Sequence, residues 1–157
     1  MKEKMITKIK DTDLFGVLHL DANRFDDEKY FTKENAFNYR LSKIRFFLGN
    51  NEGKESILGL QTFYKNKEGI EIASEKAKDE KEKELDIKAI EIPPNDYICN
   101  FYLRAGDENI TQIELVTYKG KKLIIGSKEG EDKYLEIIND NKDNIILSFF
   151  GAYRKSL

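Results

Sequence analysis

The chain has 157 residues, which is the size of a single domain. Charged residues make up 36% of the sequence, yet 27 basic and 29 acidic side chains leave a net charge of −2, which argues against a dedicated nucleic-acid binder. No run of 18 apolar residues occurs, so no membrane-spanning helix is expected. The first ten residues lack the apolar core of a secretory signal and the chain has one cysteine, so we expect a cytoplasmic protein without an intrachain disulfide.

Short runs of aliphatic and aromatic residues, separated by turns containing Gly, Asn and Asp, follow one another along the chain. Runs of this kind predict β-strands. In chain order, the predicted strands are 14–20, 41–48, 57–64, 87–92, 97–103, 110–118, 121–125, 134–138 and 145–150. Many short strands at this spacing predict an all-β sandwich, barrel or prism.

Two segments depart from the strand pattern. Residues 74–84 are rich in Lys, Glu and Asp without apolar periodicity, so we expect a short charged insertion, either a solvated loop or an exposed helical turn capped by Ser74. A binding tail is the alternative for this insertion. Residues 1–12 mix lysines with aliphatic residues and are expected to form an N-terminal extension, flexible or ordered by a partner. The domain is expected to span residues 13–157.

Side chains suited to catalysis are few. His19 is the only histidine, and its place in a predicted strand favours a structural or surface residue over a catalytic one. Cys99 alternates in phase with Phe101 and Leu103, which favours a small buried core residue, although a nucleophilic pair with His19 stays formally possible. One histidine and one cysteine cannot form a closed zinc site. No phosphate-binding or nucleophile motif occurs and no carboxylate pair stands out, so we expect no enzyme and no cofactor.

Two of the predicted strands resemble each other. Residues 57–64 and 110–117 align at an offset of 53, and a turn containing lysine and glycine follows each of them, at 65–69 and 119–120. A strand, a polar turn and a second strand that recur predict repeated β-units. Each sheet would then have one wet face, and we expect aromatic side chains, 8 Tyr and 10 Phe, to fill a shared core between the inner faces.

Several of these segments, taken together, resemble the jacalin-related lectin domain over roughly residues 13–157. The segments are 23–27, 43–49, 57–64, 92–98, 110–120 and 149–151. The resemblance implies a β-prism, in which three four-stranded antiparallel sheets surround a pseudo-threefold axis. It also implies non-catalytic sugar binding at one end of the prism, through a glycine-rich loop near the N-terminus and a Gly-x-x-x-Asp loop after the Phe-Phe-Gly strand.

The sequence departs from this family at the implied sugar site. None of the ten glycines has an Asp four residues later, and the loop at 21–24 lacks a glycine pair. Tyr153 could stack on a sugar and Arg154 suits an anionic sugar or a phosphate, although simple packing and a solvated charge are the plainer interpretations. The candidate carbohydrate-binding residues are Asn23, Arg24, Gly151, Tyr153 and Arg154.

Two functions follow as hypotheses. The first is a non-enzymatic protein-interaction or structural subunit of a larger assembly, with a degenerate sugar site. The last strand of the prism is expected to be missing, and an unpaired sheet edge can accept a strand of another protein. The aromatic-rich residues 25–47 would join that interface. The alternative is a carbohydrate-binding lectin with an altered ligand loop. The expected partners are therefore another protein or a glycan, with no nucleic acid and no membrane span.

Overall fold

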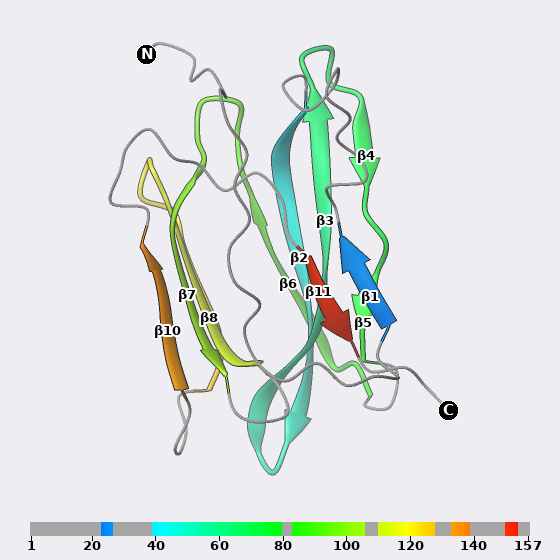
Figure 1. Ribbon diagram of the computed structural model, residues 1–157, viewed down its shortest axis with the longest axis vertical. Helices are drawn as coiled ribbons and strands as arrows, with labels where there is room; N and C mark the ends of the chain where they lie inside the picture. The colour runs from blue at the N-terminus through cyan, green and yellow to red at the C-terminus, as the bar shows by residue number, and fades with distance from the viewer. Residues whose placement is uncertain are drawn as a thin grey trace.

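The computed structural model describes residues 23–26, 39–79, 83–105, 110–127, 133–138 and 150–153. Every regular element in these ranges is a β-strand, and Figure 1 shows most of them running along the long axis of the molecule. In chain order the strands are β1 (Asn23–Asp26), β2 (Tyr39–Asn51), β3 (Lys54–Asn66), β4 (Glu71–Ala73), β5 (Ala77–Lys78), β6 (Asp86–Glu91), β7 (Ile98–Ala105), β8 (Ile110–Thr117), β9 (Lys122–Gly126), β10 (Lys133–Ile138) and β11 (Phe150–Tyr153).

The strands form three antiparallel sheets. The first pairs β1 with β11, the second has the order β4-β3-β2-β6 with β5 also on β3, and the third has the order β10-β7-β8-β9. In the second and third sheets, consecutive strands form a meander and a later strand returns beside the first, which is a Greek key. Since β3 and β8 hold the same place in their sheets, the repeat predicted at 57–64 and 110–117 is confirmed.

The strands predicted between residues 41 and 138 are confirmed, and β2 and β3 extend to 13 residues each. They extend because a two-residue turn joins them. Glu52 and Gly53 both have positive φ, at 53° and 82°, as a type I′ turn requires. The amide of Gly53 donates a hydrogen bond to Asn50 Oδ1 at 2.8 Å. The predicted strand at 14–20, with His19, lies outside the described residues, as do 145–149.

The core lies between the inner faces of the second and third sheets. Isoleucine and leucine are its most frequent residues within the described part of the chain. Its members in the described part of the chain are Leu41, Ile44, Phe46, Leu48, Tyr64, Ile90, Ile92, Ile98, Phe101, Leu103, Ile113, Leu115 and Ile125.

Cys99 does not belong to this core, so the prediction of a buried core residue is wrong. The register between β7 and β8 shifts between Ile98 and Asn100. This irregularity brings Ile98 into the core in place of Cys99, which is half-buried. The Cys99 thiol donates a hydrogen bond to the Val116 carbonyl at 3.4 Å.

The prediction of a solvated insertion is wrong for Ser74 and for β5 (Ala77–Lys78), which pack on β3 of the second sheet. Ser74 and Ala77 are buried, and β5 pairs with β3. The amide and hydroxyl of Thr62 both donate to Ser74 Oγ, at 2.8 and 2.9 Å. Gly59 permits the close approach, because a Cβ there would lie 1.9 Å from the carbonyl oxygen of Ala77. Residues 80–82 lie outside the described ranges.

Candidate functional site

The first sheet brings the two ends of the described chain together. In the antiparallel register, Asn23 faces Tyr153 and Arg24 faces Ala152, while Gly151 faces Phe25. Four candidate residues of the sequence analysis therefore lie on one pair of strands. The fifth, Arg154, lies outside the described residues.

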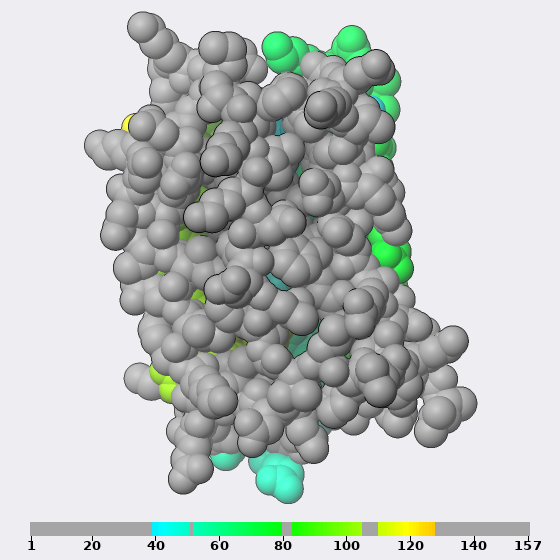
Figure 2. All heavy atoms as spheres, viewed as in Figure 1, coloured from blue at the N-terminus to red at the C-terminus, as the bar shows by residue number. Residues whose placement is uncertain are grey.

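The candidate site is the end of this sheet at which β1 begins and β11 finishes. In Figure 1 this end points down, toward the hairpin between β2 and β3. The tip of that hairpin reaches the surface at the bottom of Figure 2. Strand β5 lies against β11, so the second sheet flanks the candidate site.

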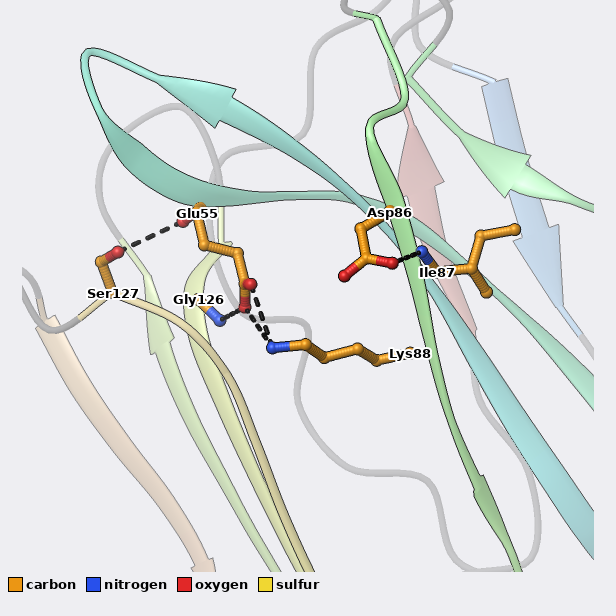
Figure 3. A network of polar contacts seen from close by, with 6 residues as sticks. All are labelled: Glu55, Asp86, Ile87, Lys88, Gly126 and Ser127. Carbon is orange, nitrogen blue, oxygen red and sulfur yellow. Dashed lines mark hydrogen bonds and ion pairs between the residues drawn. The ribbon is translucent and has the colours of Figure 1, made fainter.

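A polar network near the same hairpin joins the second sheet to the third (Figure 3). The carboxylate of Glu55 on β3 accepts a hydrogen bond from the Gly126 amide at 3.0 Å and pairs with Lys88 Nζ of β6 at 3.1 Å. The Ser127 hydroxyl donates to the backbone carbonyl of Glu55 at 3.3 Å. Gly126 has a φ of 84°, and a Cβ there would lie 2.1 Å from the Thr111 carbonyl oxygen. The network fixes the end of β9 beside β3.

Basic side chains surround β5, the strand that flanks β11. Lys78 forms an ion pair with Glu84 at 3.1 Å. Lys76 places its ammonium 4.4 Å from the centre of the Phe47 ring, and that of Lys78 lies 5.8 Å from the same ring. The sequence analysis assigned these lysines to solvent, and the structure places them over a buried phenyl ring beside the candidate site.

Asp96, which the sequence analysis did not single out, lies at the opposite end of the prism. Asp96 Oδ1 accepts hydrogen bonds from the amides of Tyr97 at 2.9 Å and Lys119 at 3.0 Å. It thereby ties the β6–β7 connection to the β8–β9 turn, where the Tyr97 and Tyr118 rings stack with centroids 5.1 Å apart. The run Pro-Pro-Asn-Asp at residues 93–96 is a typical turn sequence, and it is the pattern from which this connection could have been predicted.

Arg40 also lies at this opposite end and supports the β6–β7 connection. Its Nη1 donates a hydrogen bond to the Ile92 carbonyl at 2.6 Å. Burial lowers the pKa of the Arg40 guanidinium, because desolvation disfavours the charged form. An arginine still stays protonated at neutral pH, so this contact does not respond to physiological pH.

The described residues offer neither a metal site nor a membrane span. Nowhere in these ranges do three His, Cys, Asp or Glu side chains lie close enough to hold a metal ion. The same ranges contain no helix that is long and apolar enough to cross a membrane.

Comparison with known proteins identifies the fold. The sequence matches no family model and no curated protein. The agglutinin of Calystegia sepium matches the structure with a TM-score of 0.69 and 16% identity, over 91% of this chain and 87% of that one. Frutapin, a lectin from Artocarpus incisa, matches with 0.67 and 14%, over 96% and 92%. AcmJRL, a mannose-binding jacalin-related lectin from Ananas comosus, matches with 0.64 and 16%, over 91% and 88%. This chain has the β-prism fold of the jacalin-related lectins.

Proposed function

We propose that this chain is a non-enzymatic carbohydrate-binding module whose ligand site lies at the β1–β11 end of the prism. The register that sets Asn23 opposite Tyr153 is the observation that carries the proposal. It brings an asparagine and a tyrosine from distant parts of the chain to one end of the β-prism. The mannose binding stated for the Ananas comosus lectin supports the same class of ligand.

The chemistry of these residues suits a polyol. An Asn amide offers both donors and an acceptor to sugar hydroxyls, and a tyrosine ring can cover the apolar face of a sugar. No Asp stands four residues after Gly151, so this chain lacks the charge-assisted hydrogen bond that an acid there would make. We therefore propose weaker binding of neutral sugars than a site with that acid would give, and a cytoplasmic location for the protein.

A glycan array with the intact chain tests the proposal. We expect the intact chain to bind glycans on the array. Asn23→Ala and Tyr153→Ala should each reduce the glycan affinity about tenfold, because each variant loses one interaction of about 1.4 kcal/mol. Asn95→Ala and Tyr118→Ala are matched controls, because both residues are exposed at the opposite end of the prism. Silence of the intact chain across neutral and acidic glycans would reject the function.

The second candidate function is a protein-interaction or structural subunit, and one observation favours it. Leu85, just before β6, is 59% exposed and Ile87 on β6 is 45% exposed; β6 is an edge strand of the second sheet. Exposed apolar side chains on a sheet edge suit a protein partner. Ile87→Glu should abolish capture of a protein partner by the chain, whereas Tyr118→Glu, at a residue 49% exposed in the turn after β8, should not. Recovery of glycoproteins alone, released by free sugar, would contradict this candidate.

A further inference from the structure

The outer face of the second sheet carries a cluster of cations over two buried phenyl rings. We name this cluster the cationic face and define it as Lys43, Arg45, Lys76 and Lys78. The charged groups of Lys43 and Arg45 lie 4.6 and 5.1 Å from the centre of the Phe63 ring. Lys76 and Lys78 lie over Phe47, as described above.

The two rings face away from the core. Phe47 and Phe63 are absent from the core cluster, although they are only 1% and 7% exposed. In register, Lys43 lies directly across from Phe63, which places both on the same side of the sheet. A basic side chain can cover a ring with its aliphatic stem while its charge stays in water. The cationic face therefore consists of a layer of phenyl rings covered by the charged groups of basic side chains.

Carboxylates of the described residues form an ion pair with only one member of the cationic face. Lys78 has its ion pair with Glu84, but within the described ranges no carboxylate forms an ion pair with Lys43, Arg45 or Lys76. Glu91 faces Lys43 across the strands, whereas the cross-strand partners of Arg45 are the uncharged Gln61 and Ala89. On the third sheet, by contrast, Lys122 pairs with Glu114 at 2.9 Å.

This arrangement of cations favours the binding of an anion. A cation held over an aromatic face has a restricted position, so less conformational entropy is lost when a ligand binds it. Lys43 and Arg45 are like charges over one ring, and their mutual repulsion is relieved when an anion binds between or beside them. One strand that contributes to the cationic face, β5 with Lys78, lies against β11 of the first sheet. Figure 2 shows the green residues that follow β3 at the right-hand surface of the molecule.

We propose that the saccharide bound by this chain is anionic. Its hydroxyl groups occupy the β1–β11 end, and its sulfate, phosphate or carboxylate groups bind the cationic face through Arg45 and Lys76. The inference rests on the proposed carbohydrate-binding function and names its substrate class. The net charge of −2 does not oppose it, because the relevant charge is local.

Titration calorimetry with three probes tests the inference: a mannohexaose, its sulfated derivative, and poly(vinyl sulfonate) of similar charge. The sulfated sugar should bind at least about tenfold more tightly than its neutral parent, because its charged groups add charge-assisted hydrogen bonds. Its affinity should fall with added salt. Arg45→Gln/Lys76→Gln should remove that advantage. Lys119→Gln/Lys122→Gln, which removes the same charge elsewhere, should retain it.

The outcomes separate this inference from the proposed function. Equal binding of the neutral and sulfated sugars overturns the anionic ligand and leaves the carbohydrate function standing. Equal losses in both double variants, or equally tight binding of poly(vinyl sulfonate), show recognition of charge alone and also overturn it. Tight binding of the sulfated sugar that depends on Arg45 and Lys76 but not on Asn23 or Tyr153 supports the cationic face and rejects the β1–β11 site. Unchanged melting temperatures establish that each variant is folded.

Discussion

Gly59→Ala tests the close approach of β5 to β3 in the second sheet. The added methyl would lie 1.9 Å from the Ala77 carbonyl oxygen and 2.5 Å from Lys78 Cα. Both are backbone atoms, so no side-chain rotation relieves the clash and β5 must move away from β3. Overpacking of this kind costs about 1–3 kcal/mol. Loss of the hydrogen bond from the Asp79 amide to the Leu58 carbonyl, now 2.7 Å, adds about 1 kcal/mol.

We therefore expect Gly59→Ala to lower the free energy of unfolding by about 3 kcal/mol in urea denaturation. Hydrogen exchange should also accelerate at the amides of residues 74–79. Gly53→Ala is the control, because open space surrounds that position and its positive φ alone costs about 1 kcal/mol. A Gly59→Ala protein within about 0.5 kcal/mol of the parent, with unchanged exchange, would refute the close approach of β5.

Three further predictions concern polar contacts. Asp96→Ala should lower the free energy of unfolding by about 2–4 kcal/mol, because two amides lose their acceptor, whereas Asp96→Asn keeps Oδ1 and should cost less; urea denaturation compares them. Glu55→Gln should cost under about 1 kcal/mol in the same assay, because Lys88 is 41% exposed and the amide oxygen still accepts from Gly126. Asp86 Oδ1 accepts a hydrogen bond from the Ile87 amide and so shields that donor on the edge strand β6. Asp86→Ala should therefore raise self-association in sedimentation experiments, whereas Asp86→Asn, which keeps the acceptor, should not. Equal sedimentation of the parent and both variants would contradict this.

Much of the fold was predictable because the strand signal is local. Alternation of apolar residues marks β2, β3 and β8 directly, and the offset between β3 and β8 revealed their shared place in two Greek keys. The errors arose where one residue changes the backbone path. A register shift removed Cys99 from the core, and the glycine at 59 admitted a charged segment as a strand. A glycine inside a strong strand pattern can indicate the close approach of another backbone segment, so Gly59 could have predicted that β5 lies against β3.

The candidate site was predictable only through the family resemblance. No local pattern at Asn23 or Tyr153 indicates that the two residues meet, because their contact depends on the closure of the whole prism. The cationic face was hidden for a different reason. Lys43 and Arg45 belong to one strand, whereas Lys76 and Lys78 belong to a segment interpreted as solvated. Only the pairing of β5 with β3 places all four on one sheet.

The pairing of β1 with β11 has a consequence for how this protein matures. Closing a contact between such distant segments carries a large loop entropy, so that sheet should be the last to form. During synthesis on the ribosome, the second and third sheets can fold as soon as their own strands emerge. The β1–β11 end, where we propose the ligand site, cannot form until β11 has left the exit tunnel, so an unfinished nascent chain should lack the proposed site.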